Sequence, residues 1–140
     1  MIARLHRSIV IVAVAVWAAA LISCGSTNPN NGRVLTGISV SPETADAQTY
    51  PNGQVTYTAT GSFSLPPLSA PVTFTSPYSG SFVVDNPSGQ TIATIVSTGT
   101  GTISVQCATG AVGNVEITAS ASANNGTTTV VSGNAELTCP

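Results

Sequence analysis

The stretch Val55-Thr56-Tyr57-Thr58-Ala59-Thr60-Gly61-Ser62-Phe63 carries the clearest periodic pattern in the chain. Apolar or small residues stand at the odd-numbered positions, and hydroxyl residues stand at the even-numbered positions between them. An alternation with a period of two indicates a β-strand that buries one face and exposes the other. Pro51-Asn52-Gly53, directly upstream, is a turn signal. We therefore expect an all-β domain in which this strand is half-buried.

Shorter segments of the same character flank this strand on both sides. Strands are predicted at residues 36–42, 72–75, 82–84, 91–97, 102–108, 115–122 and about 128–139, the last with a bulge at Gly133. Asn124-Asn125-Gly126 predicts a hairpin turn, because Asn and Gly accept a positive φ. Seven to nine short strands separated by turn signals are typical of an antiparallel β-sandwich.

The composition favours the same fold class. Charged residues make up only 6% of the chain, but 42% of it is hydrophobic, so the sequence can bury a core although it is poor in charge. Thr and Val are common and favour strands, and no helical period follows residue 25.

Four segments resemble the bacterial immunoglobulin-like domains of group 2. They are Leu35–Pro42 (LTGISVSP), Pro51–Gly61 (PNGQVTYTATG), Val72–Ser76 (VTFTS) and Gly113–Ala119 (GNVEITA). The resemblance implies an immunoglobulin-like sandwich that serves as a spacer or an adhesive module at a cell surface, and it supplies no catalytic residue. The chain departs from the family in two ways: Phe74 stands where the family usually has Trp, and an extra strand follows residue 126.

The N-terminal segment has the layout of a secretory signal. Arg4 and Arg7 precede an apolar run over residues 8–22, which is short for a membrane span of about 20 residues. The run ends in Leu21-Ile22-Ser23-Cys24, and these four residues resemble the lipobox of bacterial lipoproteins. The alternative is an ordinary signal peptide, or an uncleaved N-terminal helix, with Cys24 as a spare thiol.

The lipobox resemblance implies a chemistry for Cys24. In that family the cysteine thiol receives diacylglycerol, the signal is cut before the cysteine and the new amino terminus is often acylated, so we expect acyl chains such as palmitate. Residues 1–23 are then the signal peptide, residues 24–34 a flexible linker and residues 35–140 the sandwich domain. Two or more acyl chains anchor a protein stably. Gly25 replaces the Asp that the family uses as an inner-membrane retention signal, which favours the outer membrane or the cell surface of a bacterium.

The charge that remains after the signal limits the partners. Arg33 is the only basic residue against five acidic residues, which gives a net charge of about −4. Nucleic acid is disfavoured as a partner, because binding it requires Lys and Arg to neutralise phosphate. Electrostatic docking on anionic lipid is disfavoured for the same reason. The membrane is therefore expected as a partner only through the lipid anchor.

Two cysteines are left once Cys24 is lipidated. An even pair in a secreted domain suggests a disulfide between Cys107 and Cys139. Each of them continues the apolar phase of its own strand, so both sulfurs can point inward. Two free buried thiols, or a metal or redox pair, are the alternatives. The spacing is far from CxxC and no histidine is available as a further metal ligand.

Catalytic groups are scarce. No histidine or lysine follows the signal, so a serine nucleophile would have no base. Glu116 and Glu136 are the one carboxylate pair that can be nominated, and both are expected on the solvent-facing phase of neighbouring strands. The segments 43–46 and 85–86 contain too few acidic residues for a calcium site, because calcium takes six to eight oxygen ligands. We therefore predict that the protein is not an enzyme and that it binds no metal and no cofactor.

The remaining candidates are aromatic. Tyr50 and Tyr78 stand beside prolines in turns and are the best candidates for exposed ligand-binding residues, whereas the other aromatics are expected in the core. The leading hypothesis is a non-enzymatic surface lipoprotein with a structural or adhesive module that binds a protein or glycan. The alternative is a carbohydrate- or small-ligand-binding lipoprotein that uses these two tyrosines. Strand edges without lysine also predict self-association.

Overall fold

The computed structural model describes residues 32–124 and 127–140. The predicted signal peptide, Cys24 and most of the predicted linker lie outside the described residues, as do Asn125 and Gly126 of the predicted hairpin. Within the described ranges the chain forms nine β-strands and two short 3-10 turns. They are β1 (Leu35–Ser41), β2 (Thr44–Asp46), η2 (Ala47–Thr49), η3 (Pro51–Gly53), β3 (Gln54–Phe63), β4 (Ser69–Pro71), β5 (Gly80–Asp85), β6 (Ala93–Gly99), β7 (Thr102–Cys107), β8 (Gly113–Ser122) and β9 (Val130–Cys139).

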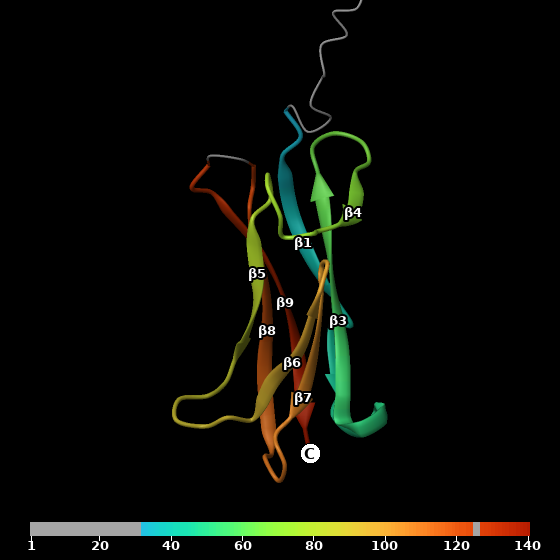
Figure 1. Cartoon of the computed structure of the whole chain (residues 1–140), viewed down its shortest axis with the longest axis vertical. Helices are drawn as coiled ribbons and strands as arrows, with labels where there is room; N and C mark the ends of the chain where they lie inside the picture. The colour runs from blue at the N-terminus through green and yellow to red at the C-terminus, as the bar shows by residue number, and fades with distance from the viewer. Residues whose placement is uncertain (1–31, 125–126) are drawn as a thin grey trace, which may run out of the picture. The chain divides into compact units, whose positions relative to one another are not determined.

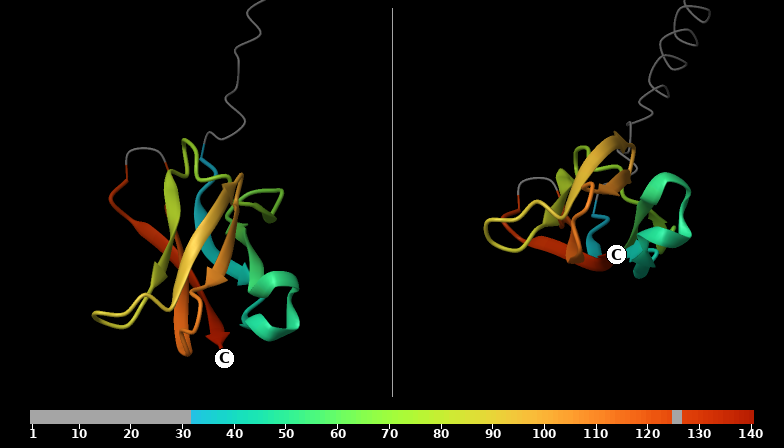
Figure 2. Two further views of the ribbon diagram at one scale, coloured as in Figure 1. Left: turned by 60° about the horizontal axis from the view of Figure 1, so that its bottom comes forward. Right: turned by 90° about the horizontal axis from the view of Figure 1, so that it is seen from below.

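The strands form two sheets packed face to face (Figures 1 and 2). Sheet A has the order β1-β3-β7-β6, with β4 also paired to β3, and sheet B has the order β2-β9-β8-β5. All pairs are antiparallel except β2 with β9, which is parallel. The predicted all-β sandwich of seven to nine strands is confirmed.

The strand order is that of the immunoglobulin fold. A constant-type immunoglobulin sandwich places strands A, B, E and D in one sheet and C, F and G in the other. Here β1, β3, β7 and β6 take the first set of positions, and β5, β8 and β9 take the second. The short strands β2 and β4 are additions to this plan, so the immunoglobulin-like arrangement holds at the level of topology.

The core lies between the sheets and is supplied by both of them. On β3 the alternation predicted from the sequence is observed, since Val55, Tyr57 and Ala59 are fully buried. Ile117 on β8 and Leu137 on β9 are fully buried on the opposite side. Burying a Val, Leu or Ile side chain contributes roughly 1.5–3 kcal/mol relative to leaving it exposed. Strands with a period of two therefore turn their apolar face toward the core.

Tyr57 links the two layers through its hydroxyl group. The Tyr57 hydroxyl donates a hydrogen bond of 3.3 Å to the backbone carbonyl of Glu136 on β9. Burial, together with the nearby Tyr50 phenol, raises the pKa of Tyr57 to about 12. The buried polar atom therefore has a partner, as buried hydroxyls require.

The segment at residues 72–75 is not a strand, contrary to prediction. The chain pairs with β3 earlier, at β4, and then leaves the sheet with a positive φ of 56° at Phe74. Val72 is nonetheless buried, and the Phe74 ring packs edge-on against Phe82 at 5.1 Å. The apolar residues that suggested a strand thus belong to a crossover segment between the sheets, whose backbone geometry an apolar pattern does not reveal.

The predicted bulge at Gly133 is also absent. The β8–β9 register runs without a shift from Gly113 opposite Cys139 to Ser122 opposite Val130. Gly133 instead marks a close approach, because a Cβ atom there would collide with the carbonyl oxygen of Ile38 on β1. The glycine lets β1 and β9 come together and close this side of the sandwich.

Candidate functional site

The charged residues of the sandwich are segregated between the two sheets. Each strand of sheet B contains one acidic residue and no basic one: Asp46 on β2, Asp85 on β5, Glu116 on β8 and Glu136 on β9. The strands of sheet A contain no Asp, Glu, Lys or Arg. The outer face of sheet B is therefore the candidate functional surface.

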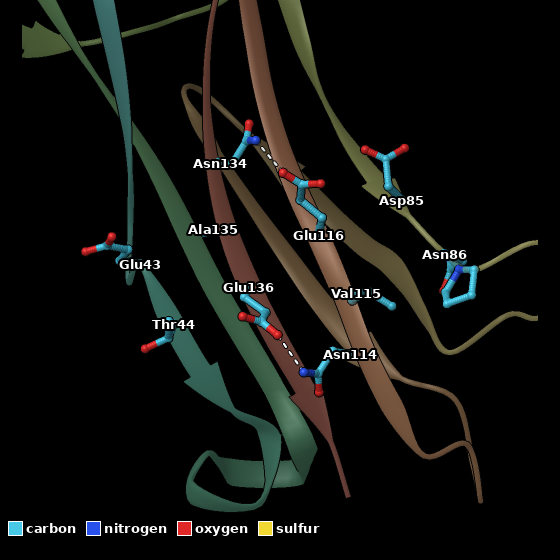
Figure 3. A pocket seen from close by; sticks show the side chains of 11 residues that line it. Glu43, Thr44, Asp85, Asn86, Asn114, Val115, Glu116, Asn134, Ala135 and Glu136 are labelled. Carbon is cyan, nitrogen blue, oxygen red and sulfur yellow. Dashed lines mark hydrogen bonds between the residues drawn. The ribbon is translucent and has the colours of Figure 1, made fainter.

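Strand register aligns three of these carboxylates. Asp85 is paired with Glu116, and Glu116 is paired with Glu136. Residues paired directly across a sheet project to the same face, so the three form a continuous line, which we call the acidic row. All three side chains are exposed (Figure 3). Glu43 lies at the end of the row, where its carbonyl accepts a 2.9 Å hydrogen bond from the backbone N–H of Glu136.

The centre of the row has a local two-fold arrangement. The Asn114 side-chain amide donates to Glu136 at 2.5 Å, and the Asn134 side-chain amide donates to Glu116 (Figure 3). Each amide therefore reaches diagonally to the acid on the neighbouring strand. The segments are similar in sequence, Gly113-Asn114-Val115-Glu116-Ile117 and Gly133-Asn134-Ala135-Glu136-Leu137. This repeated Gly-Asn-apolar-Glu-apolar pattern is a signal that the sequence interpretation missed.

The acidic row is electrostatically unfavourable for the isolated domain. Like charges directly opposite each other in a sheet destabilise it. The amide donors of Asn114 and Asn134 offset part of this cost, and the Thr118 hydroxyl donates to Asp85 at 3.2 Å. These donors are neutral, so the negative charge of the face is not cancelled.

The row borders an open depression of about 620 Å³ on the outer face of sheet B. The lining combines the carboxylates with the amides of Asn86, Asn114 and Asn134. Chemically, such a surface attracts cationic groups, while its openness to water leaves the carboxylates in the solvated position predicted for Glu116 and Glu136. Within the ranges that the structure describes, no three side chains of the metal-ligating types converge to hold a metal ion.

The predicted disulfide is present. Cys107 on β7 and Cys139 on β9 are bonded, with their Cα atoms 5.8 Å apart. The bond joins sheet A to sheet B at the end of the sandwich where the chain terminates, and Cys139 is buried. The alternatives of free thiols and of a metal pair are thereby excluded in this structure.

The two tyrosine candidates are not brought together. Tyr78 is only 7% exposed, its ring packs 5.1 Å from the Phe63 ring, and its hydroxyl donates to the carbonyl of Arg33 at 3.0 Å. The expectation that Tyr78 is exposed is therefore wrong, because this side chain closes one end of the core. Tyr50 is half-buried at the other end, where it lines a depression of about 250 Å³ beside Pro140.

Arg33 lies within the predicted linker, but its side chain is packed on the domain. Its guanidinium lies 3.6 Å from the centre of the Phe63 ring and donates to the carbonyls of Leu65, at 3.2 Å, and Pro67. The next residue continues the attachment, since the Ser64 N–H donates to the Val34 carbonyl at 2.9 Å. These contacts, which we call the arginine clasp, make the folded domain begin before the predicted residue 35.

In residues 32–124 and 127–140 there is no helix long and apolar enough to cross a membrane. Comparison of the chain with protein-family models, with curated proteins and with solved structures gives no match.

Proposed function

We propose that the protein is a non-enzymatic lipoprotein of the bacterial cell envelope, anchored through an acylated Cys24, whose sandwich acts as a structural or adhesive module. The lipobox-like residues 21–24 support the anchor. The immunoglobulin strand order of sheets A and B supports the module, because such sandwiches are common scaffolds of cell-surface domains.

One observation carries the proposal: the arginine clasp and the acidic row lie at opposite ends of the sandwich. The described chain enters at the clasp and β1 runs from there toward the end that holds the C-terminus (Figure 1). Glu43 follows β1, and Glu136 lies near the end of β9, so both belong to that far end. A domain tethered through its N-terminal side would direct its carboxylates away from a bilayer.

This orientation suits an anionic lipid surface. Anionic headgroups repel negative charge over roughly a Debye length, which is about 8 Å at physiological salt. The clasp end carries the one basic side chain of the described residues, Arg33, and the acids lie beyond it. The anchor and the charge distribution therefore favour the same placement of the domain.

The clasp would also define where the tether meets the fold. Arg33 binds the loop between β3 and β4 through two carbonyls, and its own carbonyl accepts from Tyr78. Any pull on the N-terminal segment would thus be distributed to three segments rather than to β1 alone. This is a property expected of an anchored structural module.

The test is acylation of the full chain in a bacterial host. We expect the wild type to incorporate a palmitate analogue and to fractionate with membranes, whereas Cys24→Ala loses both properties and keeps the Cys107–Cys139 bond. Ser23→Ala is the matched control, since a small residue before the cysteine is retained, and it should behave like the wild type. Membrane association of Cys24→Ala without label would contradict the proposal.

A further inference from the structure

β6 is an unusual edge strand. It pairs only with β7, and every residue after Ala93 is exposed, including Ile95 at 37% and Val96 at 46%. The β6–β7 register shifts between Ile95 and Ser97, which leaves Val96 as an extra residue in a bulge. The strand has no charge and no proline. Uncharged, β-branched, exposed edges of this kind are the ones that pair with other strands.

The sandwich is open on the side where β6 lies. On the opposite side β1 and β9 approach closely at Gly133, whereas here an open depression of about 220 Å³ separates the edges of β5 and β6. Its lining is mainly apolar and includes Phe74, Phe82 and Ile95. Apolar surface is thus exposed beside an unpaired strand edge, and a partner that extends sheet A would cover both.

Asn86 shows how much of this edge is already occupied. Its side-chain oxygen accepts from the backbone N–H groups of Ile92 and Ala93, at 2.8 and 2.9 Å, and its amide donates to the Ala93 carbonyl at 3.0 Å. The side chain therefore acts as a substitute strand at the start of β6. Beyond it, no strand of the described ranges pairs with this edge of residues 94–99.

The charge distribution selects the partner. Sheet A carries no charged residue, so two copies can meet along β6 without repulsion, whereas contact through sheet B would set acidic rows against each other. A cationic partner would be drawn to the acids of sheet B and away from β6. From this we infer that β6 pairs antiparallel with β6 of a second copy in a two-fold contact, which joins the two copies of sheet A. The inference goes beyond the proposed anchoring and does not depend on it.

We expect the β6–β6 contact to be weak and to stop at a dimer. Seven residues of strand give an edge of about 23 Å, which is short for an interface, and small interfaces below about 1,200 Å² belong to transient complexes. A two-fold contact uses the same patch on both copies and stops at the dimer. The bulge at Val96 weakens this contact further, because bulges are among the features that blunt strand edges.

Sedimentation equilibrium of the full chain in detergent micelles, over a wide concentration range, tests the inference. We expect a reversible monomer–dimer equilibrium in the wild type. Ser97→Lys places a cation on β6 and its symmetry mate, so it should raise the dissociation constant at least about tenfold. Ser39→Lys is the matched control: it makes the same change at an exposed position of β1, the other edge strand of sheet A, and should shift the constant less than about twofold.

Three outcomes would overturn the inference. A wild type that stays monomeric up to about 1 mM has no complex of even millimolar affinity. An equal or larger effect of Ser39→Lys would assign the contact to β1, and no effect of Ser97→Lys would remove it from β6. Circular dichroism checks that the variants fold, and Thr94→Lys on the same strand replaces Ser97→Lys if that variant does not. Acylation is measured separately, so failure of the anchor and failure of the dimer remain distinguishable.

Discussion

Sheet A and sheet B bury equivalent faces and expose very different ones. Val55 and Tyr57 of sheet A and Ile117 and Leu137 of sheet B are all fully buried, so both inner faces serve the core alike. Outside, the strands of sheet B carry all their charge as acids, and the strands of sheet A carry none. The core accounts for the inner faces, so the outer difference points to different surroundings for the two sheets.

The largest expected effect comes from breaking the link between the sheets. The Cys107–Cys139 bond closes a loop with a sequence separation of 32 residues, and a bond of this span stabilises by about 3–4 kcal/mol in the chain-entropy description. We expect the double variant Cys107→Ala and Cys139→Ala to lose that amount in urea unfolding. A loss below about 1 kcal/mol would mean that the sheets are held together without the bond.

Tyr57 provides the second link, and it is sensitive to pH. An unfolded tyrosine titrates near 10, and the folded value is about 12, so the folded state favours the protonated phenol. The stabilisation is fully present below pH 10 and is lost as the pH rises from about 10 to 12, by about 2–3 kcal/mol. The unfolding free energy of the wild type should therefore fall relative to that of Tyr57→Phe over this range, until the variant is the more stable protein near pH 12.

Comparison with Tyr57→Phe also isolates the contribution of the Tyr57 phenol. Ionisable groups that do not interact with Tyr57 contribute equally to wild type and Tyr57→Phe, so they cancel in the difference. At neutral pH the variant should be less stable by about 1 kcal/mol, through loss of the hydrogen bond to the Glu136 carbonyl. A difference that stays constant from pH 9 to 12 would contradict the link.

The smallest effect concerns the acidic row itself. Glu136→Lys replaces a like-charge pair with Glu116 by an opposite-charge pair, so we expect a gain of about 0.5–1 kcal/mol at low salt. The gain should shrink at high salt, because the groups are exposed. Glu136→Gln is the neutral control and should fall between the two. If Glu136→Lys is destabilising at low salt, the row is not a source of repulsion.

The sequence predicted the parts of the fold in which one strand face is buried. The alternation on β3 and β8 is direct evidence of burial, and the phase of Cys107 and Cys139 followed from the same rule. The prediction failed at Phe74, because an apolar residue in a crossover segment looks the same as one in a strand. It also failed at Tyr78, which was predicted to be exposed in a turn but is buried. Burial there depends on what the rest of the chain packs against it.

The candidate site was harder to predict than the fold. Asp85, Glu116 and Glu136 are far apart in sequence, and only the register of three strands aligns them. The repeated Gly-Asn-apolar-Glu pattern was available in the sequence, but it becomes informative only when the two segments are known to pair with their glutamates opposed. The clasp of Arg33 has no local sequence signal at all, since its partners lie about 30 residues away.

The central claim is that sheet A meets a second copy through β6 while the acidic face of sheet B stays open. Backbone amide hydrogen exchange of the full chain, compared at low and high protein concentration, reports this directly. We predict slower exchange at high concentration for the amides of residues 94–99 and unchanged exchange for those of β8 and β9. Concentration-dependent protection of β8 or β9, or of no strand at all, would contradict the claim.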